Sequence, residues 1–534
     1  MMQHGEVNVP VEIPLRAASL PAAEAWTLEV DVEVCGPDGE SRRVPAFWSG
    51  DRDFRARFAA PGPGRYTWRS RCEEPKAGLS GQEGEIEIAP YEGSRTLYRR
   101  GRLRAAASGR SLAHADGTPF FWLGDTWWMG LCKRWSWPED FQSMTADRAA
   151  KGFSVVQIVA GLYPDMPAFD ERGANEAGFP WEPDYARINP AYFDMADLRI
   201  QWLVRAGLVP CIVGCWGYFL PWMGLEKMKR HWRYLVARWS AYPVVWCLAG
   251  EVVMPYYLSE TKENDRDAQK RGWTELTRYV KEIDPHGSLV TVHPAGPWRD
   301  QLEDNSLVDF TMLHTGHGGP DSVADTISQT VQAYGQTPPK PVLDGEVNYE
   351  GILHGNGDEI QRMVFWSCVL SGACGHTYGA NGIWQINRPD KPFGPSPWGG
   401  TWGNTPWQDA ARLVGSGQLG LGAALLRRYP WWRFEPHPDW VSPAAGPENY
   451  FGLYAAGIPG EIRLIYLYNG TTPFDPTPAR VLGLEPGVRY RATFVDPRNG
   501  TEHPLGKVKR DQDGAWPIPL QPELKDWLLL LKRG

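Results

Sequence analysis

Two glutamates stand at the ends of apolar segments, where a carboxylate is placed for chemistry. Glu251 follows the apolar run 244–250, and Glu346 follows the run 341–345. A carboxylate in such surroundings loses solvation, which costs free energy. Proteins tolerate this cost mainly where the charge takes part in binding or catalysis. One carboxylate can attack an anomeric carbon while the other, with a raised pKa, protonates the leaving oxygen. The pair therefore predicts glycoside hydrolysis with retention of configuration.

Aromatic, imidazole and polar side chains follow the other apolar segments of the central region. A sugar presents flat C–H faces and many hydroxyls, which suit indole rings surrounded by polar groups. The chain has 27 tryptophans in 534 residues, and most of them lie in this region. The residues expected to bind substrate are Asp125, Trp127, Trp128, Trp216, His293, His314, Asn348, Tyr349, His376, Tyr378 and Trp384.

Each of these residues also has a structural interpretation. The two glutamates can pair with arginines, and Asp125 can cap a loop instead of binding sugar. Tyr349 and Tyr378 can donate to the nucleophile or simply pack. Asp344 lies two residues before Glu346, so we expect it on the same side of the strand, where its charge would tune its neighbour. Four tryptophans at helical spacing are expected in the core: Trp202, Trp232, Trp239 and Trp273.

The histidines raise the question of a metal site. His293, His314, His317 and His376 are candidate ligands, but the chain has no HExxH motif, and His317 follows His314 in a glycine-rich loop rather than on a helix. We therefore predict no metal and no cofactor, with at least one histidine bonded to substrate or to Glu346. The sequence also lacks a GxSxG elbow and a phosphate-binding loop.

The elements that must position these residues form three parts. In residues 26–90 apolar and polar side chains alternate, as in a β-sandwich whose sheets each have one solvent-exposed face. The last hundred residues show the same alternation. Between them, eight short apolar runs alternate with amphipathic helices, at 120–123, 154–159, 208–213, 244–249, 289–292, 309–313, 341–343 and 374–378.

This order predicts an α/β chain, a (β/α)8 TIM barrel flanked by two small all-β sandwich domains. The expected boundaries are 1–97, 98–430 and 431–534. A doubly wound sheet is the alternative, but no glycine-rich phosphate motif follows the first strand. In a barrel the carboxyl ends of the strands share one mouth, so the two glutamates on opposed strands would face each other there.

Charge and cysteine content limit the classes of partner and the cellular compartment that we expect. The net charge of −8 offers no basic surface for nucleic acid or an anionic membrane. The uncharged run 206–225 contains prolines and glycines, which favours a buried strand and its loop over a membrane span. The eight cysteines form no CxxC pair, and residues 1–10 show no signal peptide, so we expect a cytoplasmic protein with reduced thiols.

Two longer motifs carry a resemblance to a known family. The stretch 119–128 (PFFWLGDTWW), the Gly250-Glu251 pair and the stretch 340–351 (KPVLDGEVNYEG) resemble the apiosidase-like glycoside hydrolases. The resemblance implies an immunoglobulin-like domain before the barrel, a β-domain after it, and a retaining mechanism with Glu251 as acid/base and Glu346 as nucleophile. Family members often have aspartate at the position of Glu251. The wider clan has asparagine at the position of Gly250, and that asparagine contacts the sugar 2-hydroxyl. In this chain the contact must come from another residue, such as Asn348 or a histidine.

Together these observations predict an exo-acting, retaining glycosidase. Its partner would be a small oligosaccharide or glycoside that carries a terminal apiose-like or other plant-derived pentose or hexose. A non-catalytic carbohydrate-binding or scaffold protein is the alternative from another class, and a metal-dependent hydrolase is a third. Neither the sugar nor the oligomeric state follows from the sequence.

Overall fold

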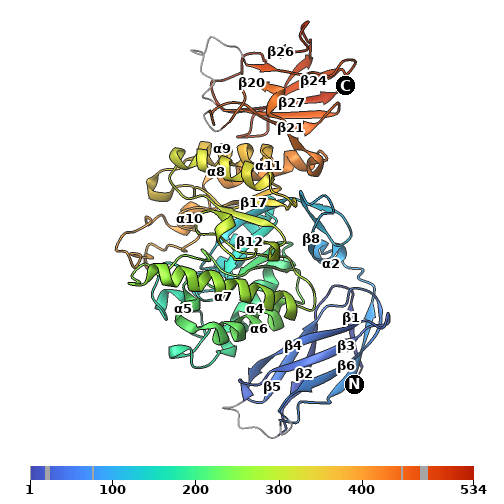
Figure 1. Ribbon diagram of the computed structural model, residues 1–534, viewed down its shortest axis with the longest axis vertical. Coiled ribbons are helices and arrows are strands. Elements are labelled where there is room, and N and C mark those ends of the chain that lie inside the picture. The colour runs from blue at the N-terminus through green and yellow to red at the C-terminus, as the bar shows by residue number, and fades with distance from the viewer. Residues whose placement is uncertain (1, 19–24, 75–76, 447–448, 469–478) are drawn as a thin grey trace.

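A closed ring of eight parallel strands forms the centre of the computed structural model, which describes residues 2–18, 25–74, 77–446, 449–468 and 479–534 (Figure 1). The strands lie in the order β15 (Val290–Thr291), β14 (Val245–Cys247), β13 (Val209–Val213), β12 (Val155–Val159), β11 (Trp122–Trp127), β18 (Gly375–Tyr378), β17 (Val342–Glu346) and β16 (Thr311–His314). The backbone N–H of Asp309 donates to the carbonyl of Val290 at 2.8 Å across the seam between β15 and β16. The predicted TIM barrel is confirmed.

An α-helix follows every strand of the ring except β15, after which the described residues form only short 3-10 turns, and the helices cover the outside of the ring (Figure 1). They are α3 (Glu139–Ala150), α4 (Pro190–Arg205), α5 (Phe219–Met223), α6 (Leu225–Trp239), α7 (Lys262–Ile283), α8 (Pro320–Tyr334), α9 (Asp358–Leu370) and α11 (Val414–Arg427). Proline at the first turn starts α4 and α8, because a missing N–H costs nothing there. Trp232, Trp239 and Trp273 are fully buried beneath these helices and Trp202 is partly buried, as their spacing predicts.

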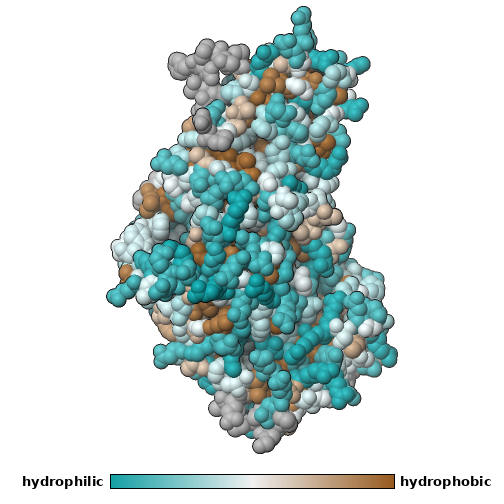
Figure 2. All heavy atoms as spheres, viewed as in Figure 1, coloured by the Kyte–Doolittle hydropathy of each residue, from teal (hydrophilic) through white to brown (hydrophobic). Residues whose placement is uncertain are grey.

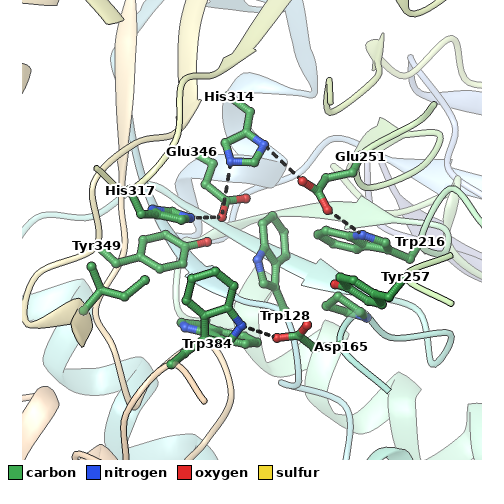
Figure 3. A pocket seen from close by; sticks show the side chains of 13 residues that line it. Trp128, Asp165, Trp216, Glu251, Tyr257, His314, His317, Glu346, Tyr349 and Trp384 are labelled. Atoms are coloured by element: carbon green, nitrogen blue, oxygen red, sulfur yellow. Dashed lines mark hydrogen bonds and ion pairs between the residues drawn. The ribbon is translucent and has the colours of Figure 1, made fainter. Parts of the chain in front are cut away.

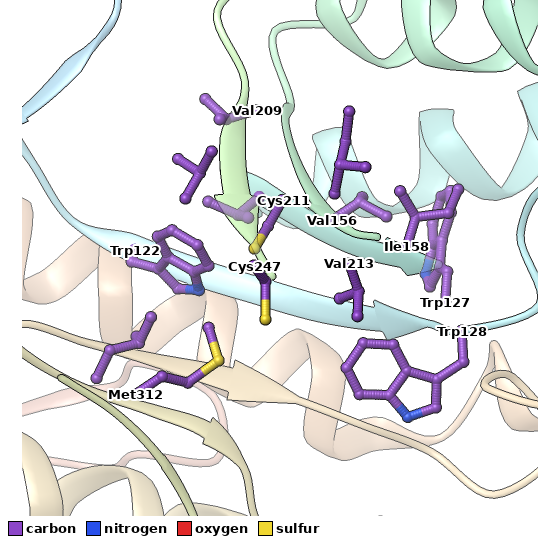
Figure 4. Close-up of a cluster of buried hydrophobic side chains, with 14 of the residues drawn as sticks. Trp122, Trp127, Trp128, Val156, Ile158, Val209, Cys211, Val213, Cys247 and Met312 are labelled. Atoms are coloured by element: carbon purple, nitrogen blue, oxygen red, sulfur yellow. The ribbon is translucent and has the colours of Figure 1, made fainter. Parts of the chain in front are cut away.

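The inside of the ring is filled with apolar side chains (Figure 4). Trp122, Cys211, Cys247 and Met312 come from four different strands and are at most 2% exposed. Each large side chain removed from water in this way contributes about 1.5–3 kcal/mol to folding. This packing fills the interior of the barrel below its mouth.

The first barrel strand begins later than the sequence indicates. The expected run starts at Phe120, but Pro119–Phe120 is strand β10, which joins a small antiparallel sheet with β9 (Leu112–His114) and β8 (Leu103–Ala105). The barrel strand β11 starts at Trp122 and ends at Trp127. As a result, Asp125 and Trp127 lie within the strand and not beyond its end.

The N-terminal region forms a seven-stranded sheet, in the order β1 (Met2–Glu6), β7 (Glu83–Ala89), β6 (Gly64–Cys72), β3 (Val30–Cys35), β4 (Ser41–Gly50), β5 (Asp53–Phe58) and β2 (Val11–Arg16). All neighbours are antiparallel except β1 and β7. Val30, Val32 and Val34 point into its core, as the alternation predicts. The short helix α2 (Thr96–Arg100) leads from this sheet toward the barrel.

Two sheets pack face to face at the C-terminal end. The larger has the order β19 (Glu435–Pro436), β21 (Tyr454–Ile458), β22 (Ile462–Leu467), β27 (Trp527–Arg533), β24 (Tyr490–Val495) and β25 (Glu502–Lys507). The smaller has β20 (Val441–Ser442), β23 (Arg480–Val481) and β26 (Trp516–Pro517). Val441 and Val481 of the smaller sheet share one core with Ile465 and Leu529 of the larger.

The two β-regions lie at opposite ends of the long axis of the molecule, with the barrel between them (Figure 1). Hydrophilic side chains cover most of the face shown in Figure 2, and hydrophobic ones form only small patches. Among the described residues, no helix combines the length and the apolar character that a membrane crossing requires. The residue boundaries of the three parts stay a prediction.

Candidate active site

A cavity of about 110 Å³ opens at the carboxyl ends of the barrel strands (Figure 3). Its aromatic lining consists of Trp128, Trp216, Tyr257, Tyr349, Trp384 and Trp402. Its ionisable lining consists of Asp165, Glu251, His314, His317 and Glu346. The cavity is smaller than the roughly 300–1,000 Å³ of pockets for drug-sized ligands, so it suits one small ring at a time.

A second, larger cavity of about 450 Å³ lies between α8 and the C-terminal sheets. Its described lining is mostly apolar, with Ile327, Val331 and Leu453 among its residues, and includes no carboxylate or imidazole. General acid–base and nucleophilic chemistry need such groups. The mouth of the barrel is therefore the candidate active site.

Glu346 ends strand β17 and is surrounded by histidines. The Nε2 atom of His317 donates a hydrogen bond to Oε1 at 2.9 Å, and Nε2 of His293 lies 2.8 Å from Oε2. The Nε2 atom of His314 lies 3.9 Å from Oε1. Burial alone would raise the pKa of Glu346, but these three imidazoles hold it well below its usual range. Glu346 is therefore ionised at neutral pH.

His293 connects the two glutamates. Its Nδ1 atom accepts a hydrogen bond from the backbone N–H of Glu251 at 3.3 Å. In the neutral ring the other nitrogen then carries the proton, so Nε2 is the donor that faces Glu346. The side chain of His293 is fully buried. A buried imidazole with a fixed tautomer holds the nucleophile candidate in one orientation.

Glu251 has a different environment, dominated by an indole. The Nε1 atom of Trp216 donates to its Oε2 at 3.0 Å, and Nδ1 of His314 lies 3.7 Å from its Oε1 (Figure 3). Burial raises the pKa of Glu251, and the charge of Glu346 adds to the rise, although His314 and Trp216 oppose it. The residue also has a φ of 42°, a backbone strain that is typical of functional sites.

Trp216 explains why glycine and not asparagine precedes Glu251. A Cβ atom at Gly250 would lie 2.2 Å from Cε3 of the indole. Position 250 and Trp216 also form a parallel β-bridge, which keeps the two backbones side by side. The ring occupies the space that an asparagine side chain would need, so the departure from the clan pattern is a direct consequence of this tryptophan.

A β-bulge turns Glu346 toward the cavity. Leu313 of β16 pairs with Asp344, whereas the next residue, His314, pairs with Glu346, so Gly345 is an extra residue in β17. Asp344 therefore faces outward, where Thr330 of α8 donates to its carboxylate at 3.2 Å. The expectation that Asp344 and Glu346 share a side is wrong, because the bulge breaks the alternation.

Asp125 and Trp127 also face the helices. Arg148 of α3 pairs with Asp125 at 2.6 Å, both side chains fully buried, and Nε1 of Trp127 donates to the same carboxylate at 2.7 Å. The ring of Trp127 packs edge-on against Trp135 and Phe141. Both residues lie within β11 at outward positions, so they brace the barrel wall and do not line the cavity.

Three further predicted residues lie outside the cavity lining. Asn348 bonds to both backbone groups of Gly319 and so holds the loop that carries the two mouth histidines. His376 lies in β18 beneath the ring of Phe365 on α9. Tyr378, also in β18, donates to Glu350 at 2.5 Å. Because Asn348 does not line the cavity, its position does not support the expected contact to the sugar 2-hydroxyl.

The structure brings together eight of the predicted residues at or beside the cavity: Glu251, Glu346, Trp128, Trp216, His293, His314, Tyr349 and Trp384. Sequence reasoning missed Asp165, Tyr257 and Trp402. It named His317 only as one of four histidines, of which at least one was expected to bond to substrate or to Glu346. Asp165 and Trp402 lie in long loops after β12 and β18, where no periodicity indicates which way a side chain points. For His317 the signal is its spacing, three residues after His314 on the same loop.

The same geometry contains a possible metal-binding group. One ligand atom each of His293, His314 and Glu346 lies within 4.8 Å of the others. Ligands of a tetrahedral zinc ion lie about 3.3 Å apart, given Zn–N bonds of about 2.0–2.1 Å. The contacts of His293 and His317 to Glu346, at 2.8 and 2.9 Å, are hydrogen-bond distances instead.

The catalytic domain profile of one family, described as apiosidase-like, matches residues 106–433, which is more than half of the chain. The chain belongs to the apiosidase-like family. A second profile, described as a domain of unknown function (DUF5060), matches residues 10–73 within the N-terminal sheet. No curated protein matches the chain.

Solved structures share the fold of this apiosidase-like protein. One titled "Glycoside hydrolase" has 23% identity and a TM-score of 0.68, covering 83% of this chain and 99% of that one. A glycoside hydrolase family 5 structure from Bacteroides vulgatus ATCC 8482 has 23% identity and a TM-score of 0.67, covering 82% and 94%. A third structure from that strain covers 100% of both chains, with 16% identity and a TM-score of 0.69. The family assigns the protein as a glycosidase, and these structures share its fold.

Proposed function

We propose that this glycosidase is exo-acting and retaining, with Glu346 as nucleophile and Glu251 as acid/base. The observation that carries the proposal is the opposed environment of the two carboxylates. Imidazoles lower the pKa of Glu346, whereas burial raises the pKa of Glu251. A pair of titratable groups whose pKa values are pushed apart is the arrangement that divides nucleophile from acid.

The chemistry runs in two steps. An oxygen of Glu346 attacks the anomeric carbon as the bond to the leaving oxygen breaks, and Glu251 gives its proton to that oxygen. Water then attacks the anomeric carbon of the glycosyl-enzyme, Glu251 takes its proton, and Glu346 is released. Trp216 orients the acid and the histidines orient the nucleophile, so both are positioned before substrate binds.

The small cavity supports exo action on a terminal sugar. Rings of Trp128 and Trp384 can cover a sugar face, and Glu251 and Glu346 line the same cavity (Figure 3). A terminal apiose-like or other plant-derived pentose or hexose, carried by an oligosaccharide or glycoside, is the proposed substrate class.

Variants at the two glutamates test this proposal. On a panel of aryl glycosides, Glu346→Gln should lose about 10³-fold or more of kcat. Glu251→Gln should lose about 10²- to 10⁴-fold with poor leaving groups, keep most of the first step with good ones, and recover turnover with azide as a small nucleophile. The exposed Glu260→Gln, on the same face of the barrel, serves as the matched control.

The stereochemistry of the first product decides the mechanism. Proton NMR should show the same anomeric configuration in the released sugar as in the substrate. An inverted first product would contradict the retaining mechanism. Activity that falls on dialysis against a chelator and returns with Zn²⁺ would instead favour the metal-dependent alternative at His293, His314 and Glu346.

A further inference from the structure

A third carboxylate lines the cavity and has no role in the two-step chemistry. Asp165 lies in the loop after β12 and is 3% exposed. The Nε1 atom of Trp402 donates to its Oδ2 at 2.5 Å, whereas its Oδ1 is buried without a hydrogen bond of good geometry among the described residues. A buried carboxylate oxygen in this condition is costly, because the nearby hydroxyls of Ser396 and Tyr257 replace its lost solvation only in part.

The backbone at Asp165 is strained as well. Its φ of 61° lies in the left-handed region, which aspartate tolerates better than most residues but still at some cost. Burial raises the pKa of Asp165, and the nearby hydroxyls of Ser396 and Tyr257 oppose the rise only in part. Strain and incomplete hydrogen bonding at one residue of a cavity wall point to a ligand contact.

The position of the carboxylate defines what that ligand offers. Asp165 lies beside Tyr257 and away from Glu346, so a sugar whose anomeric carbon meets Glu346 presents its far hydroxyls to Asp165 (Figure 3). An ionised carboxylate only accepts hydrogen bonds, and its two oxygens match two neighbouring O–H donors.

We propose that Asp165 is a specificity-determining residue that accepts hydrogen bonds from two neighbouring hydroxyls of the terminal sugar, with Trp402 fixing the orientation of its carboxylate. This inference rests on the proposed function, because it takes Glu346 as the group that meets the anomeric carbon. It assigns the substrate as a glycoside whose terminal ring keeps a free vicinal diol at the part of the ring that faces Asp165.

Deoxygenated substrates test the contact directly. The wild type and Asp165→Asn are compared on one hydrolysed aryl glycoside and on its monodeoxy analogues. Removal of either contacted hydroxyl should lower kcat/KM of the wild type about 10- to 100-fold. On the parent glycoside, kcat/KM of Asp165→Asn should be about 10- to 100-fold lower than that of the wild type. Removal of either of the two hydroxyls should then change kcat/KM of the variant very little. Equal sensitivity of both proteins to every deletion would overturn the proposal.

Two further variants separate recognition from structure. Asp170→Asn removes the same charge from the same loop, but Asp170 pairs with Arg172 at 2.7 Å and does not line the cavity, so its hydroxyl preferences should match the wild type. Trp402→Phe keeps a ring and deletes the N–H donor, and it should weaken discrimination at the same two hydroxyls. If Asp165→Asn shifts only the alkaline limb of the pH profile of kcat/KM, Asp165 acts as a charge that changes the pKa of Glu251. That result would overturn the proposal.

A binding measurement keeps this test independent of turnover. Tryptophan fluorescence is titrated with free xylose, arabinose, glucose, galactose and mannose in the wild type and in Asp165→Asn. If no glycoside is hydrolysed, the proposed function fails, but tighter binding of a monosaccharide by the wild type still supports the Asp165 contact. Equal affinities in both proteins, or no binding by either, overturn the contact even where hydrolysis is observed.

Discussion

At the scale of single residues, the three imidazoles around Glu346 should set the acidic limit of activity. Activity needs ionised Glu346, so it is lost as pH falls through a pKa that lies below 4.5. Activity also needs protonated Glu251, so it is lost as pH rises through a pKa that lies above 4.5. A bell-shaped profile of kcat/KM follows, with its limbs on opposite sides of the ordinary glutamate value.

Removing one hydrogen-bond donor to Glu346 should shift only the acidic limb of the pH profile. In His317→Ala the carboxylate of Glu346 loses the hydrogen bond at 2.9 Å, so its pKa rises and the acidic limb of kcat/KM shifts to higher pH. The alkaline limb should stay in place. His4→Ala, at an exposed position of the N-terminal sheet, should leave both limbs unchanged. A profile of His317→Ala that matches the wild type would show that His317 does not stabilise the charged nucleophile.

At the scale of elements, the end of β14 depends on a glycine. In Gly250→Ala the new Cβ would lie 2.2 Å from the ring of Trp216, so the indole must move and its hydrogen bond to Glu251 is lost. Displacement of a positioned acid by about 1 Å costs on the order of 10²-fold in rate. We expect kcat to fall about 10- to 100-fold with poor leaving groups.

The matched control for this substitution is Gly417→Ala. Position 417 lies in α11, where an added Cβ meets no atom within 4 Å, so activity should be unchanged. Folding is followed for both variants by thermal unfolding. Full activity in Gly250→Ala with an unchanged unfolding temperature would mean that Trp216 does not orient the acid.

The elements also show how far sequence reasoning reached. The eight strands were predictable because apolar runs and helices alternate, and the two glutamates because they end such runs. The side that a residue faces was not predictable at β11 and β17. In β11 the strand continues to Trp127, so Asp125 and Trp127 lie inside it and not beyond its end. In β17 the extra Gly345 reverses the alternation. Asp165 and Trp402 lie in loops, where tertiary contacts alone decide direction.

At the scale of the whole molecule, a buried ionic cluster joins the N-terminal sheet to the barrel. Arg57 of β5 pairs with Asp197 of α4 at 2.6 Å, and Arg238 of α6 pairs with the same carboxylate at 2.8 Å. The Nη1 atom of Arg57 also donates to the carbonyl of Arg238 at 2.9 Å. Burial would raise the pKa of Asp197, but Arg238 and Arg57 lower it to about 2.

This cluster makes stability depend on pH in a defined direction. A carboxyl whose pKa is lower in the folded chain stabilises the fold above its unfolded pKa, and this contribution is lost as pH falls toward about 2. Asp197→Asn leaves two buried guanidinium groups without their carboxylate, which costs about 3–5 kcal/mol of the free energy of unfolding. Urea unfolding at pH 7 should show this loss, and the difference from the wild type should shrink at pH 3.

Asp194→Asn is the control on the same helix. Asp194 also pairs with Arg238, but its side chain is 59% exposed, so its removal should cost no more than about 1 kcal/mol. Because the cluster lies on the outside of α4 and α6, away from the barrel mouth, Asp197→Asn should keep the kcat/KM of the wild type at temperatures where it is folded. Loss of activity in the folded variant would mean that docking of the N-terminal sheet shapes the cavity itself.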